Sequence, residues 1–387
     1  AIVGPSGSGK SSVVKAGLIP ALRQGAIRGS DKWFVTEMVP GTHPLEELEM
    51  SLWPIAVDPP PSLVEPMQRD PRGMLRTIRR IMPNEEEAQL LLVIDQFEEL
   101  WSLTPEDRRH HFLDSLLAAL SAPHSPLRVI ITLRADFYDR PLQYQPIAEL
   151  FKQHTELVLP LNRDELTWAI QEPARRVGVE FDDTVLPAIV AAVDEQPGAL
   201  PLLQYALTEL FDARTGSRIE RQAYDEIGGV LGALPRRADE IFDGLSPSEK
   251  VVARQFFLRL ITLGEGVEDT RRRVLLSELE AINLENGRTS QAEGVKQNSD
   301  LQSPILKIVD RFGAARLLTF DHDPLTRKPT VEVAHEALLR EWNRLRDWLD
   351  ESRDDIRLQR LLTTAVSEWQ LSDHSQGYLL QGARLTQ

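Results

Sequence analysis

The segment GPSGSGKS at residues 4 to 11 constrains the fold of this chain more than any other feature. It matches the pattern G-x-x-x-x-G-K-[ST], follows a short apolar run at residues 1 to 3, and precedes a stretch at residues 12 to 18 that can form a helix. In such a strand, loop and helix, the glycines let backbone N–H groups point inward, where they and the helix N-terminus attract phosphate oxygens. The sequence therefore predicts a P-loop that binds a nucleoside triphosphate.

The residue types within this loop predict how the phosphates and their metal are held. Lys10 supplies a flexible positive charge for the β- and γ-phosphates, and Ser11 supplies a hydroxyl for the octahedral shell of Mg²⁺. Backbone groups of the whole loop contribute as well. The predicted nucleotide-binding residues of the loop are Gly4, Pro5, Ser6, Gly7, Ser8, Gly9, Lys10, Ser11 and Ser12.

A second signal is the apolar run at residues 90 to 94, which ends in Asp95 and is followed by Glu98 and Glu99. Because α/β proteins bind ligands at the carboxyl ends of their strands, Asp95 is expected to face the P-loop and to hold Mg²⁺ through water. Glu98 or Glu99 would then polarise the attacking water, and we favour Glu99. Taken alone, acidic residues after a strand more often mark a solvated helix start, but the P-loop upstream favours the functional interpretation.

A third apolar run, residues 129 to 133, ends in Arg134. The same sheet edge would bring Arg134 to the γ-phosphate, but a structural pairing with Asp136 or Asp139 stays open, and both arrangements can hold in different states. The predicted catalytic residues are thus Glu99, Glu98, Arg134 and Lys10, and the predicted metal ligands are Ser11 and Asp95.

Missing motifs and composition narrow the class of protein. No Asn is followed by Lys, so the N-K-x-D motif of GTPases is missing, as is the LSGGQ-like signature of transporter ATPases; ATP or ADP with Mg²⁺ is the expected ligand. With 59 acidic against 44 basic residues and a net charge of −15, the chain repels polyanions, which disfavours nucleic acid as a general partner. The absence of cysteine agrees with a cytoplasmic location.

Two further expectations concern the surroundings of the chain. Its longest apolar run is far shorter than the ~20 residues of a membrane-spanning helix, so no membrane partner is expected. The sequence begins at Ala1 without an initiator Met, so we expect further sequence upstream.

Hydrophobic periodicity predicts the domain organisation. Apolar runs at residues 33 to 39, 90 to 94, 128 to 133 and 156 to 159 alternate with helical stretches, which predicts an α/β P-loop NTPase domain with a parallel sheet at residues 1 to 161. Within it, the Pro-rich segment at residues 54 to 71 is predicted to be a surface loop. A helical domain (162–234), a winged-helix domain (235–345) with a mobile insertion (283–303) and a C-terminal helical segment (346–387) are expected to follow.

Five segments occur in an order that resembles the STAND class of signal-transduction ATPases. They are GPSGSGKSS at the N-terminus, LLLVIDQFEELW at 90–101, ITLRADFYDR at 131–140, PGALPLLQYALTEL at 197–210 and VAHEALLREW at 333–342. The similarity is greatest to the novel STAND branch, related to NACHT, NB-ARC and AAA+ proteins. The resemblance implies that Pro201 packs against the adenine and that His335 touches the β-phosphate of bound ADP.

The resemblance departs from the family pattern at two points. Gln96 stands where NACHT proteins usually carry a small residue, which leaves the division of roles between Glu98 and Glu99 open. The family's adenine-side residues, upstream of the first strand, are not in this sequence.

The resemblance also implies a function. The expected protein is a slow ATPase that switches between an ADP-bound closed state and an ATP-bound state that self-associates. Its partners would be an N-terminal effector and a C-terminal sensor, such as WD40 repeats, that responds to an unknown trigger in bacterial defence or stress signalling. Two alternatives stay open: a DNA-binding initiator or transcription regulator that uses the basic cluster Arg271 to Arg273, and a scaffold that binds nucleotide without hydrolysing it.

Overall fold

The computed structural model describes residues 1–83, 88–194, 196, 198–264, 269–279, 304–323 and 326–371. It divides the chain into two compact units, which are described separately below: residues 1–233 with 322–328, and residues 234–321 with 329–387. The predicted insertion at 283–303 and the end of the predicted C-terminal segment lie outside the described residues. The finer division into four domains stays a prediction.

The first unit is built on a five-stranded sheet whose neighbouring strands are all parallel. The strand order is β2-β3-β4-β1-β5, so β4 lies between β1, which precedes the P-loop, and β3, which precedes Asp95. This sheet confirms the predicted α/β P-loop fold. The strands are β1 (Ile2–Gly4), β2 (Phe34–Met38), β3 (Leu90–Ile94), β4 (Leu127–Arg134) and β5 (Glu156–Leu157).

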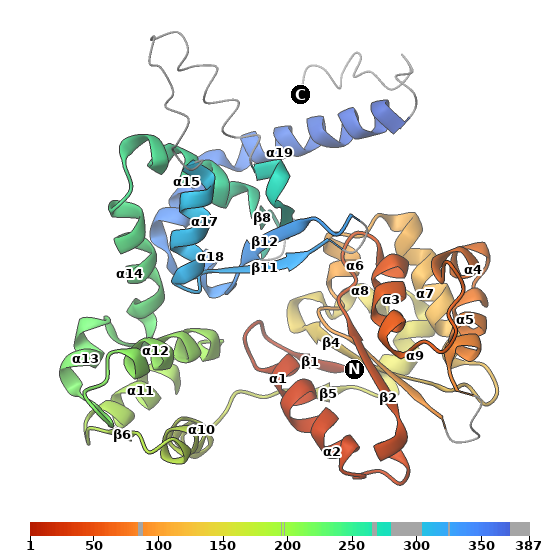
Figure 1. Cartoon of the computed structure of the whole chain (residues 1–387), viewed down its shortest axis with the longest axis horizontal. Coiled ribbons are helices and arrows are strands. Elements are labelled where there is room, and N and C mark those ends of the chain that lie inside the picture. The colour runs from red at the N-terminus through yellow and green to blue at the C-terminus, as the bar shows by residue number, and fades with distance from the viewer. Residues whose placement is uncertain are drawn as a thin grey trace. The chain divides into compact units, whose positions relative to one another are not determined.

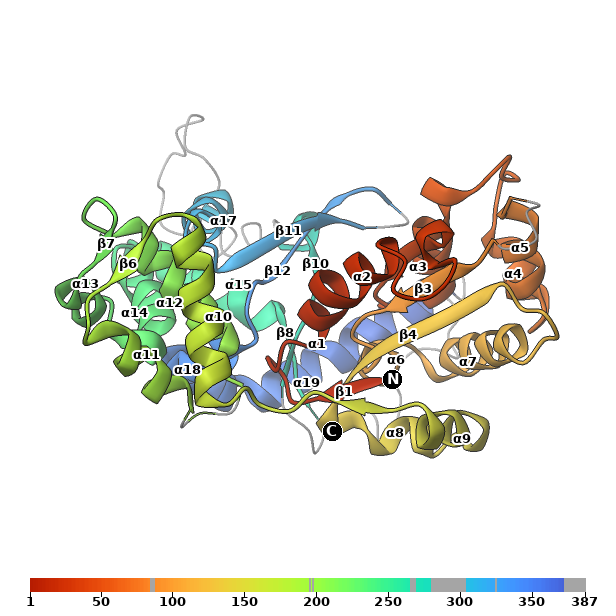
Figure 2. The same cartoon turned by 90° about the horizontal axis from the view of Figure 1, so that it is seen from below.

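Helices cover both faces of this sheet, as expected for a parallel sheet. One continuous helical segment, made of α1 (Lys10–Ser12), the π-helical η1 (Val13–Leu18) and α2 (Ile19–Arg23), packs Val14 and Leu22 against Leu91 and Val93 of β3. In Figure 2 this segment lies above the strands, and α8 (Asp139–Leu142) and α9 (Gln145–Gln153) lie below them. All five residues of β3 are buried, so Asp95 at its end is held firmly.

Further helices pack around the sheet in the same unit (Figure 1). They lie between the strands in the sequence, where helical stretches are predicted. They are α3 (Pro44–Leu52), α4 (Val64–Arg69), α5 (Gly73–Ile81), α6 (Glu99–Ser102) and α7 (Glu106–Leu120), with 3₁₀ turns at Ser30–Lys32, Trp53–Ile55 and Ala135–Phe137.

The prediction of a surface loop at residues 54 to 71 was wrong for α4. Pro66 lies in the first turn of this helix, where no backbone N–H is needed, so the proline does not prevent helix formation. The Glu49 carboxylate also accepts hydrogen bonds from the N–H groups of Leu63 (2.6 Å) and Val64 (3.2 Å), which satisfies the start of the helix. Met67 is fully buried and anchors α4 to the rest of the unit.

Helices form most of the remainder of the first unit. A capping box between Asn162 and Glu165 starts α10 at Arg163. A short parallel pair, β6 (Glu180–Phe181) and β7 (Arg218–Ile219), was not predicted, because two-residue strands leave no alternating pattern. The helices are α10 (Arg163–Arg176), α11 (Val185–Asp194), α12 (Leu200–Asp212), α13 (Arg221–Glu226) and α14 (Gly229–Asp243), of which α14 continues into the second unit.

The second unit combines helices with small sheets around an aromatic core. Its elements are α15 (Pro247–Arg259), β8 (Ile261–Thr262), β9 (Thr270–Arg271), β10 (Val274–Leu275), α17 (Pro304–Ala314), β11 (Leu318–His322), β12 (Pro329–Val333), α18 (Ala337–Glu341) and α19 (Asn343–Leu371). Strands β10, β12 and β11 form one sheet in that order. The winged-helix assignment stays a prediction. Across the described helices of both units, none has the length and apolarity to span a bilayer.

Candidate functional site

The loop between β1 and α1 turns tightly at two glycines. Gly7 and Gly9 have φ angles of 72° and 88°, in the left-handed region that side chains with a Cβ rarely adopt. A Cβ on Gly7 would lie 2.8 Å from the carbonyl oxygen of Gly198 and 2.9 Å from the ring of Pro201. Glycine is therefore required at position 7 both for the backbone conformation and for the close approach of the segment that opens α12.

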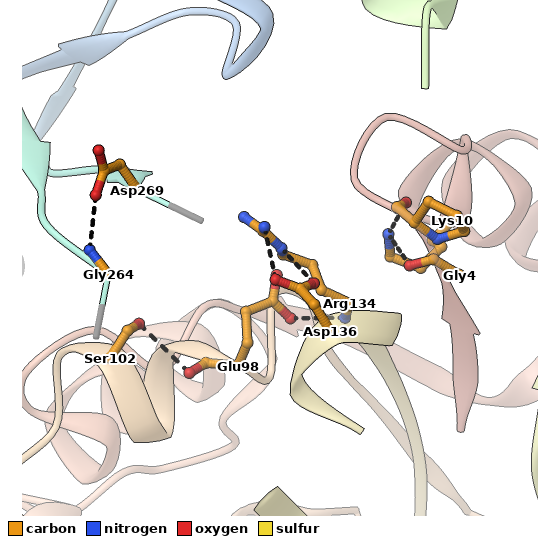
Figure 3. A network of polar contacts seen from close by, with 9 residues as sticks. Gly4, Lys10, Glu98, Ser102, Arg134, Asp136, Gly264 and Asp269 are labelled. Atoms are coloured by element: carbon orange, nitrogen blue, oxygen red, sulfur yellow. Dashed lines mark hydrogen bonds and ion pairs between the residues drawn. The ribbon is translucent and has the colours of Figure 1, made fainter. Parts of the chain in front are cut away.

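Lys10, the first residue of α1, is buried against the loop that precedes it. Its ammonium donates hydrogen bonds to the carbonyl oxygens of Gly4 (3.1 Å) and Pro5 (2.8 Å) (Figure 3). The chain thus holds the ammonium at the mouth of the loop, where the helix N-terminus adds partial positive charge. Positive charge and loop N–H groups together suit an anion such as phosphate.

Ser11 and Asp95 meet at the carboxyl edge of the sheet, although 84 positions separate them in the sequence. The Ser11 hydroxyl donates to Asp95 Oδ1 at 2.7 Å, and Asp95 is only 5% exposed. A hydroxyl and a carboxylate side by side are the hard oxygen donors that Mg²⁺ prefers. The two residues therefore fit a magnesium site.

Thr132 is a member of this cluster that sequence reasoning missed. Its hydroxyl donates to Asp95 Oδ1 at 2.5 Å and accepts from the N–H of Gln96 at 3.0 Å. Thr132 pairs in register with Ile2, so β4 carries it between β1 and β3. Within an apolar run a threonine is a common strand former, and only its place beside the Asp95 strand marks it as polar support for the site.

Glu98 is buried at the same edge and has an unusual protonation equilibrium. Burial raises its pKa from 4.5 to about 7, against the opposing influence of backbone hydrogen bonds and of the Lys10 and Arg134 charges. Its Oε2 accepts a hydrogen bond from the backbone N–H of Arg134 at 3.2 Å (Figure 3). Near neutral pH, both protonation states of Glu98 are populated, which suits a general base.

Glu99 has a different environment from Glu98. It is the first residue of α6, and its Oε2 accepts a hydrogen bond from the backbone N–H of Gly41 at 3.1 Å. This bond ties the start of α6 to the segment that follows β2. Glu98 therefore accepts a hydrogen bond from Arg134 and feels the positive charges of Lys10 and Arg134, whereas Glu99 accepts a hydrogen bond from the Gly41 backbone.

Gln96, which departs from the family pattern, adopts a strained backbone conformation between Asp95 and Glu98. Its φ of 54° lies in the left-handed region, which favours glycine and, among residues with a Cβ, Asn and Asp. Its N–H bonds to Thr132 Oγ1, and the next N–H, of Phe97, bonds to the Thr132 carbonyl at 2.9 Å. Strain of this kind often accompanies functional sites, and here it turns the chain sharply after Asp95.

The side chain of Arg134 forms a bidentate ion pair with Asp136. Its Nε and Nη2 donate to the two Asp136 carboxylate oxygens at 3.0 and 2.9 Å (Figure 3). Arg134 is almost fully buried, and its guanidinium also lies 5.6 Å from the Phe137 ring centroid. This confirms the structural pairing that the sequence left open, while a contact with the γ-phosphate stays a prediction.

The first unit thus brings together most of the predicted site residues: the loop, Asp95, Glu98, Arg134 and Pro201.

His335 belongs to the second unit, just before α18. Burial, and secondarily the positive charge of Arg271, lower its pKa. Arg271 also donates to the neighbouring carbonyl of Ala334 at 3.3 Å. His335 is therefore held as a largely neutral imidazole near a fixed positive charge.

The basic cluster at residues 271 to 273 is paired with acidic side chains. Arg271 lies 3.6 Å from Glu332, Arg272 lies 3.2 Å from Glu278, and Arg273 lies 3.7 Å from Asp321. The cluster spans the turn between two short strands, since β9 ends at Arg271 and β10 begins at Val274. The pairing neutralises the cluster and reduces its attraction for polyanions.

Comparison with known proteins gives one family and several solved structures. Residues 1–377 match the family described as Novel STAND NTPase 1, and no curated protein matches the chain. The chain is similar to the ORC1 protein of Aeropyrum pernix in complex with DNA (14% identity, 92% of this chain, 88% of that chain, TM-score 0.45). It is also similar to Cdc6p from Pyrobaculum aerophilum (11% identity, 91% and 87% covered, TM-score 0.41).

Proposed function

The chain belongs to the novel STAND NTPase 1 family, and from this premise we propose that it is a P-loop ATPase that binds ATP with Mg²⁺, hydrolyses it slowly and uses the bound nucleotide as a switch. The observation that carries the proposal is the meeting of the P-loop with Asp95. The Ser11 hydroxyl lies 2.7 Å from Asp95 Oδ1, and the buried Lys10 immediately precedes Ser11 in the same helix. These are the groups that a triphosphate and its metal require.

Each residue of the site has a role in this proposal. The loop N–H groups and Lys10 bind the β- and γ-phosphates, and Ser11 and Asp95 hold the metal, directly or through water. When bound, Mg²⁺ would neutralise charge that develops on the phosphates. Thr132 keeps the Asp95 carboxylate oriented through its 2.5 Å hydrogen bond. Pro201, whose ring would lie 2.9 Å from a Cβ on Gly7, would pack against the base, as the family resemblance implies.

We assign the activation of water to Glu98 rather than Glu99. A general base works best when its pKa is near the working pH, and the pKa of Glu98 is about 7. Glu99 instead accepts a hydrogen bond from the Gly41 backbone. Arg134 fixes the orientation of the Glu98 carboxylate through its backbone N–H and remains a candidate for contact with the γ-phosphate.

The switch itself is a finer proposal, based on the family. ADP would be held in a closed state in which His335 touches its β-phosphate, and exchange for ATP would release this contact and allow self-association. An N-terminal effector and a C-terminal sensor, such as WD40 repeats, would couple the switch to a trigger in bacterial defence, in the cytoplasm. Shifting such an equilibrium from 1:99 to 99:1 needs about 5.5 kcal/mol of differential binding, which nucleotide and trigger would supply together.

Phosphate release separates the ATPase from a non-hydrolysing scaffold. We expect Glu98→Gln to bind ATP with unchanged affinity, measured by calorimetry, and to lose about 100-fold or more of the wild-type rate, typical of a general base. The matched variant Glu99→Gln should keep most of the rate. A greater loss in Glu99→Gln would reverse the assignment, and a wild type that binds ATP but releases no phosphate would favour the scaffold.

Nucleotide retention tests the role of His335. Wild type purified with ADP should keep it through desalting, whereas His335→Ala should lose it faster and should self-associate at lower ATP concentration, measured by light scattering. The exposed His154→Ala is the control for loss of an imidazole. Equal retention and equal particle mass in His335→Ala and wild type would contradict the proposed closed state.

A further inference from the structure

Lys15 is a second lysine at the nucleotide site, outside the P-loop motif. It lies in η1, four positions after Ser11 on the helical segment that continues from the loop. Residues at this spacing share a helix face, so Lys15 reaches the same sheet edge as Ser11. A π-helical segment at this point is itself a feature that often accompanies functional sites.

The two oxygens of the Asp95 carboxylate have different partners. Oδ1 accepts hydrogen bonds from Ser11 and Thr132, while Oδ2 lies 3.5 Å from the Lys15 ammonium. Lys15 also forms a closer ion pair with Glu37 Oε2, at 2.8 Å. Its ammonium therefore lies between a buried acid and a partly exposed one.

Exposure shows which of these contacts can be exchanged. The side chain of Asp95 is 8% exposed, whereas those of Lys15 and Glu37 are 47% and 39% exposed. A buried carboxylate without a counter-charge is costly, so the proximity of Lys15 stabilises ionised Asp95. Because Lys15 is flexible, half-exposed and already paired with Glu37, its ammonium can move away from Asp95 at little cost.

We propose that Lys15 is a built-in counter-ion that competes with Mg²⁺ for Asp95, and that Glu37 receives the Lys15 ammonium when the metal binds. This inference rests on the proposed nucleotide site. A divalent cation beside Asp95 repels an ammonium within a few ångströms, so the two cations exclude each other. Lys15 thus lowers the dependence of nucleotide binding on Mg²⁺, and Glu37 tunes that effect.

The proposal predicts opposite effects for the two members of the ion pair. In Lys15→Met, Asp95 has no competing cation, and the ratio of the Kd for ADP in EDTA to the Kd in Mg²⁺ should rise about tenfold, equivalent to about 1.4 kcal/mol. In Glu37→Gln, Lys15 loses its ion pair with Glu37 and keeps the one with Asp95, so it competes more strongly with the metal. The same ratio should then fall severalfold. Lys15→Arg, which keeps the charge, should stay near wild type.

Calorimetric titration of ADP into the full chain, with Mg²⁺ or with EDTA, measures these ratios. Lys152→Met, which removes an exposed lysine from α9, is the control, and thermal melting checks that each variant folds. If Lys15→Met does not fold, Glu37→Gln and Lys15→Arg still carry the test. Equal ratios in wild type, Lys15→Met and Glu37→Gln overturn the Lys15 proposal alone, whereas a wild type that binds no ADP overturns the nucleotide site as well.

Discussion

The loop edge of the five-stranded sheet and the core of the second unit bury opposite kinds of side chain. At the sheet edge, Lys10, Asp95, Glu98 and Arg134 are all buried, and each is held by hydrogen bonds or charges. In the second unit, the fully buried Trp342 is surrounded by aromatic rings, and the paired arginines 271 to 273 lie outside that core. The comparison indicates that the buried side chains of the first region serve the chemistry of the site, whereas those of the second region serve stability.

The largest expected effect tests the stability side of this comparison. Trp342 has its ring centroid 5.1 Å from that of Phe257, and its Nε1–H donates to Asp239 at 2.8 Å. We expect Trp342→Ala to lower the unfolding free energy of the second unit by about 3–5 kcal/mol, because it leaves a cavity in the aromatic core, although Asp239 keeps its ion pair with Arg344. Hydrogen exchange of the slowest amides in each unit measures this change.

The exposed Trp168 in α10 provides the control for the loss of an indole. It is 68% exposed, so Trp168→Ala should change the unfolding free energy by no more than about 0.5 kcal/mol. If Trp342→Ala accelerated exchange equally in β1, β3 and β4, the two regions would not be energetically separate, and the comparison would fail.

The second prediction concerns the cost of burying Glu98. Its folded pKa is raised from 4.5 to about 7, so the folded state binds more protons than the unfolded state between these values. The stability from protonated Glu98 is present below pH 4.5 and is lost as pH rises through 7. Relative to wild type without nucleotide, Glu98→Gln should therefore gain about 3 kcal/mol of unfolding free energy between pH 4.5 and pH 8.

Urea unfolding of wild type and Glu98→Gln at these two pH values measures the gain, since every other group titrates in both proteins. Glu220→Gln, which neutralises an exposed carboxylate, should show little pH-dependent difference from wild type. A constant difference between Glu98→Gln and wild type across the range would mean that Glu98 is not buried as an isolated acid.

The contrast between Glu98 and Glu99 shows where sequence reasoning reached its limit. The P-loop and the strand ending in Asp95 were predictable, because a fixed motif and a buried run place both at one sheet edge. Which of two adjacent glutamates meets the backbone N–H of Arg134 depends on where α6 begins, and a shift of one residue reverses the answer. Thr132 was hidden for a related reason, since only the pairing of β4 between β1 and β3 reveals what its hydroxyl meets.

The third prediction tests the chemistry side of the comparison. The buried Lys10 donates hydrogen bonds to the carbonyl oxygens of Gly4 and Pro5. Lys10→Ala should weaken ATP binding about 100-fold, or about 2.7 kcal/mol, because a charge-assisted bond to phosphate is lost. Calorimetry measures the affinity, with the exposed Lys152→Ala as control. An affinity within threefold of wild type would contradict the phosphate site.

The smallest expected effect lies among the arginines of the second unit. Arg272 pairs with Glu278 at 3.2 Å, and both side chains are partly exposed. Such surface pairs contribute little, so Arg272→Ala should lower the unfolding free energy by no more than about 1 kcal/mol, and a double-mutant cycle with Glu278→Gln should give a coupling of similar or smaller size. Salt-titrated DNA binding should be equally weak in wild type and Arg272→Ala, since the acidic partner already neutralises the guanidinium. A DNA affinity that falls with Arg272→Ala and with rising salt would instead make this cluster a functional surface, and the second unit could no longer be regarded as mainly a packing core.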